Sequence, residues 1–308
     1  MRLRLCAILF VVAVPLFAGR APAVTVAVPS KVLGTTRSVL VSLPEGYERS
    51  KDRYPVLYMT DGEKHLGSAI ASADALAGVD RMPPVIIVAI PHTDRIRDLT
   101  PTHVDRAMQE GVMRTYPNSG GGRALGRFVA GELIPAIESR FRTAPYRMFA
   151  GHSLGGLFGL DLFLESPDLF QAWLIVSPST GWDGGAIFRR AEALAPRGAK
   201  TTVLLMHGEE GEEMASGVER VRASLRARGV EVSVLVFPDD DHITVPMPAY
   251  YAGLRRVFKP WFFRILDSDD PEVLSARIVK HYEELSARYG YRIAIPEHRL
   301  ERIRSLRR

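Results

Sequence analysis

One segment of the sequence has the residue types and spacing that nucleophilic catalysis requires. It reads Gly151-His-Ser153-Leu-Gly155 and lies between a short apolar run and a helical pattern. A Gly-x-Ser-x-Gly motif in that position predicts a nucleophile elbow, a strained strand-to-helix turn that exposes the serine hydroxyl. Such a turn leaves no room for side chains two positions away on either side, which accounts for both glycines. The motif therefore predicts Ser153 as a nucleophile, and the alternative is an ordinary glycine-rich turn.

The same turn would place a backbone N–H where it can stabilise an oxyanion, and the residue concerned is Leu154. A serine hydroxyl is a weak nucleophile, so it also needs a general base, expected downstream in the order serine, acid, histidine. We select His242, which follows the last expected strand and would lie at the carboxyl edge of the sheet. The alternative is a solvent-exposed turn histidine.

The acid that would orient this imidazole is expected in the glutamate-rich loop after the strand at 203–206. We select Glu210; the alternatives are Glu209, Glu212 and, after the preceding strand, Asp183. Most of the glutamates in this loop are expected to form the acidic first turn of the next helix, where negative charge suits the helix dipole.

Hydrophobic periodicity places these residues on alternating strands and helices. The strands are expected at 38–43, 55–60, 85–90, 148–150, 173–176, 203–206 and 232–237, and the helices at 124–141, 155–165, 214–228 and 250–258. Several strands are almost continuously apolar, as expected when helices cover both faces of a sheet. The pattern predicts the α/β class with a mostly parallel central sheet.

The first 23 residues have the layout of a secretory signal. Two arginines precede the apolar stretch from Leu5 to Ala18, and small residues follow up to Ala23. The stretch is shorter than the roughly 20 residues that a membrane-spanning helix needs. We therefore expect a signal peptide at 1–23 that is cleaved, and a periplasmic or secreted protein, with an uncleaved membrane tether as the alternative.

Composition excludes several classes of protein. The 308 residues are 46% hydrophobic and 24% charged, a globular balance. The net charge of +5 falls close to neutral once the three arginines of the leader are removed, which argues against nucleic-acid binding. Cys6, the single cysteine, lies in the leader, so disulfides, cysteine nucleophiles and Cys-ligated zinc are excluded from the mature chain. No metal or cofactor is expected.

The domain organisation follows from a change of character near residue 267. Residues 24–266 are expected to form the catalytic domain and 267–308 a helical appendage, in which Asp269-Asp270-Pro271 opens a polar helical stretch to Tyr289. The basic end, 299–308, is expected to be a solvated helix rather than a nucleic-acid arm. We expect no membrane span after cleavage of the signal.

Further segments resemble a known family over nearly the whole mature chain. They are Leu43-Pro-Glu-Gly-Tyr47, the strand and turn 54–62, the stretch 95–102, Gly120-Gly-Gly122 with Glu132-Leu-Ile-Pro135, and Ser177-Pro-Ser179. With the elbow, they resemble the Putative esterase family of α/β-hydrolases, which includes esterase D and the enterochelin-type siderophore esterases. The resemblance implies the α/β-hydrolase fold.

For the site, the resemblance implies Ser153 as nucleophile, His242 as base, an acid at the position of Glu210, and an oxyanion hole completed by the N–H of Gly62 with that of Leu154. The sequence departs from the family in two places. Thr180-Gly181 stands where the family usually has two bulky residues, and the glutamate-rich loop after the strand at 203–206 is one residue shorter than the family pattern.

These residues predict a serine carboxylic-ester hydrolase that works through an acyl-enzyme. A siderophore trilactone or another small acyl or phenolic ester is the expected substrate. The alternatives are an acyltransferase and a non-catalytic ligand-binding module on the same scaffold. Arg95, Arg97 and Trp182 are candidates for contacts with an acidic or aromatic substrate, although an ion pair or a packed indole would explain them equally well.

Overall fold

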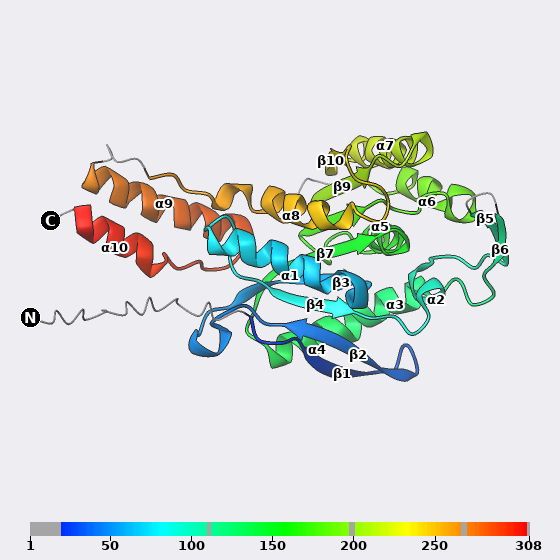
Figure 1. Ribbon diagram of the computed structural model, residues 1–308, viewed down its shortest axis with the longest axis horizontal. Coiled ribbons are helices and arrows are strands. Elements are labelled where there is room, and N and C mark those ends of the chain that lie inside the picture. The colour runs from blue at the N-terminus through cyan, green and yellow to red at the C-terminus, as the bar shows by residue number, and fades with distance from the viewer. Residues whose placement is uncertain (1–19, 110–111, 197–200, 266–269, 307–308) are drawn as a thin grey trace, which may run out of the picture.

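The structure is a computed structural model that describes residues 20–109, 112–196, 201–265 and 270–306. In this part of the chain, eight strands form a central sheet in the order β1-β2-β4-β3-β7-β8-β9-β10 (Figure 1). The strands are β1 Val24–Ser30, β2 Thr35–Ser42, β3 Tyr54–Thr60, β4 Ile86–Ile90, β7 Thr143–His152, β8 Ala172–Val176, β9 Thr202–Gly208 and β10 Glu231–Phe237. From β4 to β10 the neighbours in the sheet are all parallel, whereas β1 and β2 pair antiparallel.

The sheet is therefore mostly parallel, as the sequence predicts. In β3, β4 and β8 every residue is buried, because both faces of these strands are covered. Neighbouring side chains of one strand enter different cores: Val56 and Tyr58 pack on one face, Leu57 and Met59 on the other. Parallel strands end at a common edge, which collects the loops after β3, β7, β8, β9 and β10.

Helices cover both faces. The first face carries α1 Gly62–Gly78 and α8 Pro246–Val257, which lie side by side, and α9 Pro271–Tyr289 (Figure 1). The second carries α3 Gly122–Phe128, the π-helical turn Val129–Leu133, α4 Ile134–Arg140, α5 Leu154–Glu165, α6 Trp182–Glu192 and α7 Glu212–Ala227. Short helices are α2 Arg95–Leu99 and the 3-10 turns Tyr47–Arg49 and Lys259–Trp261.

The expected strands and the four expected helices are confirmed, with shifted ends, but several elements were not predicted. These are β1, α1, α2, α6 and the two-stranded ribbon of β5 Arg106–Gln109 and β6 Val112–Thr115. The buried side of α1 consists largely of small residues such as Ala69, Ser72 and Ala73, so it carries little apolar periodicity. In α6, left-handed backbone at Asp183 interrupts the helical pattern.

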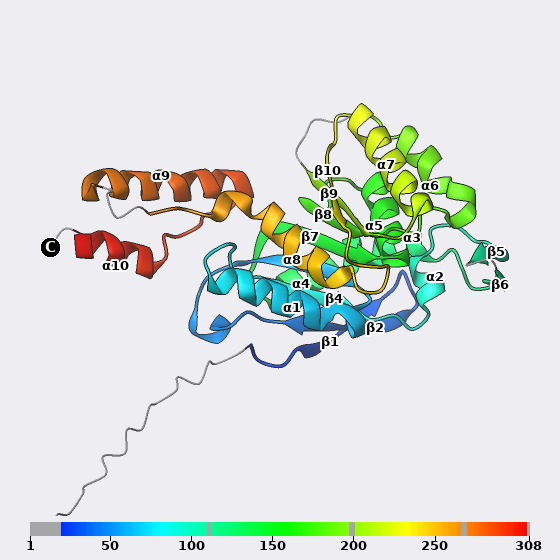
Figure 2. The ribbon, with the colours of Figure 1, turned by 45° about the horizontal axis from the view of Figure 1, so that its top comes forward.

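The C-terminal helices α9 and α10 Glu297–Leu306 lie at one end of the molecule, opposite the β5–β6 ribbon (Figures 1 and 2). Leu274, Ile278 and Tyr282 of α9 are buried in the same apolar core as α1 and α8. The proposed boundary at residue 266 stays a prediction. Most of the predicted signal, including Cys6, lies outside the described residues. None of the described helices combines the length and apolar character needed to cross a bilayer.

Candidate active site

Ser153 occupies the turn between β7, which ends at His152, and α5, which begins at Leu154. Its backbone has φ 61° and ψ −120°, a conformation that a residue with a side chain rarely adopts. The Ser153 N–H donates a hydrogen bond to the carbonyl of Val176 at 3.0 Å, which fixes the turn to β8. A strained backbone persists only where its surroundings enforce it, and such strain clusters at functional sites.

The two glycines of the motif are required by close packing. A Cβ atom on Gly151 would overlap the carbonyl oxygen of Gly155. A Cβ atom on Gly155 would overlap Thr60 Oγ1 and come within 3.2 Å of Asp61 Oδ2. The elbow thus packs tightly against the end of β3, and a side chain at either glycine position would clash.

His242 and Glu210 meet as the sequence predicts. His242 Nδ1 lies 2.5 Å from Glu210 Oε2, and the Glu210 side chain is 6% exposed. The other carboxylate oxygen, Oε1, accepts hydrogen bonds from the Gly208 N–H, at 3.0 Å, and from Ser177 Oγ. Burial opposes ionisation of Glu210, but these donors, His242 foremost, outweigh it and lower its pKa to about 2. Glu210 is therefore a carboxylate at neutral pH.

The remaining acid candidates lie elsewhere. Glu212 and Glu213 form the first turn of α7, as expected for glutamates that complement a helix dipole. Asp183 is the second residue of α6 and has a φ of 52°. Of the described acidic residues, Glu210 is the one that bonds the His242 ring.

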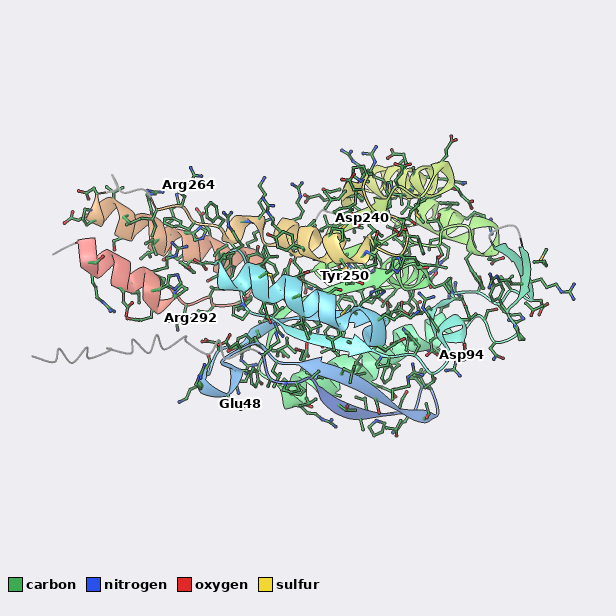
Figure 3. All side chains as sticks on the ribbon, in the orientation of Figure 1. Glu48, Asp94, Asp240, Tyr250, Arg264 and Arg292 are labelled. Carbon is green, nitrogen blue, oxygen red and sulfur yellow. The ribbon has the colours of Figure 1, made fainter. Side chains whose placement is uncertain are left out.

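The loop of His242 packs against the elbow. The ring of His242 lies 4.7 Å from that of His152, centroid to centroid, and His152 directly precedes Ser153. In Figure 3, the labelled residues Asp240 and Tyr250 mark the two ends of the segment that contains this loop and the first part of α8. Among the described residues, the side chain within hydrogen-bond distance of Ser153 Oγ is Ser179, at 3.4 Å between the hydroxyl oxygens. Approach of the serine hydroxyl to His242 therefore involves a change of partner, and catalytic hydrogen bonds often tighten only when substrate is bound.

A second layer of histidines supports this arrangement. His65 meets His152 edge to face, with centroids 5.4 Å apart. Burial, followed by repulsion from His242 and His65, lowers the pKa of His152 to about 3. Burial also lowers the pKa of His65. His152 therefore stays uncharged at neutral pH. Within this cluster, the ring that bonds a carboxylate is His242.

Leu154 and Gly62 are the first residues of α5 and α1. N–H groups in the first turn of a helix have no acceptor within the helix, so they are available to an anion. The close approach of Gly155 to Thr60 and Asp61 brings these two helix starts together. Both N–H groups therefore belong to the same region as Ser153.

The residue before Gly62 is held by a buried network. Asp61 is completely buried and forms a two-point ion pair with Arg95, at 2.5 and 3.0 Å. Burial opposes its ionisation, but the hydrogen bonds and charge of Arg95 lower its pKa. The Asp61 N–H also donates to His92 Nε2 at 3.2 Å. These contacts fix the start of α1.

The predicted substrate contacts all have partners within the chain. Arg95 pairs with Asp61, and Arg97 pairs with Asp98 at 2.8 Å. The indole N–H of Trp182 donates to the Thr102 carbonyl at 3.2 Å. Their role in binding substrate stays a prediction. Within the described residues, no group of three or more potential metal ligands is present.

Sequence reasoning did not select Ser177, Ser179, His65, His152 or Asp61 as part of the site. The Ser-Pro-Ser segment was noted for its resemblance to the family, and His152 for its place in the elbow, but neither signal indicates a contact with Glu210 or His242. These contacts join residues that are far apart in the chain.

Comparison with known proteins identifies the family. Residues 30–242 match the family described as Putative esterase. Ferri-bacillibactin esterase BesA of Bacillus subtilis (strain 168) is 29% identical over 234 residues, which are 67% of this chain and 80% of that protein. The apo-salmochelin esterase of Escherichia coli O6:H1 is 27% identical over 222 residues, 66% of this chain and 68% of that protein.

Among solved structures, an IroE-like serine hydrolase from Shewanella oneidensis superposes with a TM-score of 0.78 and 26% identity, covering 91% of this chain and 92% of its own. The fold, the family match and the elbow point to the same conclusion. The chain belongs to the Putative esterase family and is a serine esterase with the α/β-hydrolase fold.

Proposed function

We propose that this chain hydrolyses carboxylic ester bonds of a siderophore, with Ser153, His242 and Glu210 as its catalytic triad. The observation that carries the proposal is the hydrogen bond between the buried Glu210 and His242 Nδ1, at 2.5 Å. The loop that holds His242 also packs against the elbow of Ser153. The siderophore as substrate is supported by the relatives named for ferri-bacillibactin and salmochelin.

The bonding of His242 defines its role in each proton transfer. Because Nδ1 faces the carboxylate of Glu210, the proton rests on Nδ1 and Nε2 is free to accept another. Ser153 Oγ attacks the ester carbonyl carbon and passes its proton to His242 Nε2. Glu210 stabilises the resulting imidazolium and holds the ring in place.

The developing oxyanion is stabilised by the N–H groups of Leu154 and Gly62. As the tetrahedral intermediate collapses, the bond from carbon to the alcohol oxygen breaks, and His242 gives its proton to that oxygen. Water then attacks the acyl-enzyme and loses a proton to His242. The acid is released, and Ser153 regains its proton.

A fluorophosphonate probe with peptide mapping tests the nucleophile. Labelling of the peptide that contains Ser153, absent from the Ser153→Ala variant, is the expected result. Labelling of another residue would contradict the assignment. Release of free acid from a catecholate trilactone, faster than from a simple aryl ester and unchanged in yield when an alcohol acceptor is added, would identify a siderophore hydrolase rather than an acyltransferase.

We also propose that the protein is exported. The support is the basic, apolar and small-residue layout of residues 1–23. Sequencing the amino terminus of the protein purified from a periplasmic or secreted fraction is expected to give a chain that starts at Val24. A chain that starts at Met1 and stays with the cytoplasmic fraction would refute export.

A further inference from the structure

One face of α8 carries large apolar side chains in water. Ile243, just before the helix, is 77% exposed, and Met247 and Tyr251 are 65% and 40% exposed. Met247 and Tyr251, four residues apart in α8, lie on the same side of the helix and form an apolar stripe, and Ile243 lies in the turn that leads into it. The buried side of α8 packs into the apolar core through residues such as Ala249 and Tyr250. The stripe is therefore an outer surface that no described element covers.

The stripe ends in a cationic hollow of about 440 Å³. Its lining includes Arg81, Arg255, Arg256 and Lys259, together with the aromatic rings of Tyr251 and Phe262. The guanidinium carbon of Arg81 lies over the ring of Phe262, 3.5 Å from its centroid. Two segments that are far apart in the chain, the loop after α1 and the end of α8, thus bring positive charge to one place.

These cations lack counter-charges. No acidic side chain among the described residues lines the hollow, and in the same part of the chain Arg81, Arg255 and Lys259 form no ion pair. Arg256 has a hydrogen bond to Ser233 Oγ at 3.5 Å. The helix dipole accounts for Arg255 and Arg256 in the last turn of α8, with Lys259 just beyond its end, but not for Arg81, which comes from the loop after α1. Clustered like charges repel, so the arrangement favours an anion.

We propose that this face of α8 docks on a bilayer that contains anionic phospholipid. The lipid phosphates would bind the cations of the hollow, and Met247 and Tyr251 would enter the interface between headgroups and acyl chains. A soluble anion would satisfy the charges but leave the apolar stripe in water, whereas an anionic bilayer satisfies both. Because Ile243 follows His242, docking would bring the candidate active site close to the lipid surface. The inference does not depend on the proposed substrate.

A fluorophore placed on the stripe tests the docking directly. The full chain with Cys6→Ser and Met247→Cys, labelled with an environment-sensitive dye, is mixed with vesicles of phosphatidylcholine and phosphatidylglycerol in equal amounts. A blue shift of the emission is expected with these vesicles and not with pure phosphatidylcholine. A dye at Arg127→Cys, on α3 across the sheet, is expected to show no shift. This local readout separates docking of α8 from any binding through the apolar leader.

Charge reversal supplies the second arm. Arg255→Glu with Arg256→Glu, in the protein labelled at 247, is expected to weaken vesicle binding at least ~10-fold, since two charges that attract the anionic surface become charges that it repels. The matched control, Arg127→Glu with Arg226→Glu, changes the net charge equally on exposed residues of the other helical layer and is expected to bind as the parent does. Circular dichroism checks that each variant is folded.

Any one of the following outcomes would overturn the proposal. The dye at 247 could show no shift with anionic vesicles, or the same shift with pure phosphatidylcholine. The control pair could weaken binding as much as the pair in α8. Inorganic phosphate could bind in the hollow, measured by calorimetry, without any shift by vesicles, which would reassign the hollow to a soluble anion.

Discussion

Ser177 Oγ donates a hydrogen bond to Glu210 Oε1, the carboxylate oxygen that His242 does not use. Ser177 is completely buried, has a φ of 40°, and is fixed by a hydrogen bond from its N–H to the Met206 carbonyl at 2.7 Å. The residue after β8 thus orients a side chain from the loop after β9. Glu210 is held from both sides, which leaves Oε2 facing the imidazole.

Replacing this serine tests whether it positions the acid. Ser177→Ala is expected to lower kcat/KM about 10-fold, the scale of one hydrogen bond to a charged group. Losing a donor also raises the pKa of Glu210 from about 2, so any loss of activity that protonation of this carboxylate causes should begin at a higher pH than in the parent. The measurement is kcat/KM across pH. A profile that falls by the same factor at every pH would indicate a structural effect only.

The choice of Glu210 as the acid can be tested against its sequence neighbour. Glu210→Gln keeps the shape but removes the charge that stabilises the imidazolium, so kcat should fall roughly 1,000-fold or more, with KM little changed. Glu209→Gln alters the adjacent glutamate and is expected to retain nearly full activity. Equal losses in both variants would show that the acid is misassigned.

Local chemistry in the sequence was enough to nominate the residues of the proposed triad. The elbow motif nominates Ser153, chain order nominates His242, and the loop after a strand nominates Glu210 among neighbouring glutamates. Ser177 and His152 could not be assigned in this way, because their contacts join loops from different strands at one sheet edge. Similarly, α1 was missed because close packing on the sheet selects small residues such as Ala73, which leave no apolar periodicity.

The steric argument for the elbow predicts opposite effects at two glycines. Gly155→Ala would force its Cβ into Thr60 Oγ1 at the end of β3, so it should destabilise the fold by about 1–3 kcal/mol and reduce labelling of Ser153. Gly67→Ala, in α1, meets nothing within 4 Å and should stabilise the protein by about 1 kcal/mol, because alanine favours the helix. Urea unfolding measures both. Unchanged stability and labelling in Gly155→Ala would contradict the close packing of Gly155 on Thr60.

The histidine layer beneath His242 predicts how stability depends on pH. The folded-state pKa of His152 is about 3, below the ordinary 6.5 of an unfolded chain. As pH falls below 6.5, the unfolded chain binds a proton that the folded protein does not, so the free energy of unfolding decreases until pH reaches about 3. For this single residue, the decrease between pH 7 and pH 5 is ~2 kcal/mol.

His152→Gln removes that proton-binding site and should make the loss of stability between pH 7 and pH 5 smaller by ~2 kcal/mol, whatever the variant costs at neutral pH. Urea unfolding at the two pH values gives this difference of differences. His298→Gln, in α10 at the far end of the molecule, serves as the control variant. The lowered pKa of His65 leaves part of the slope in place. Parallel losses in the parent and in His152→Gln would mean that His152 accepts a proton in the folded protein, and that it does not remain a neutral support for His242.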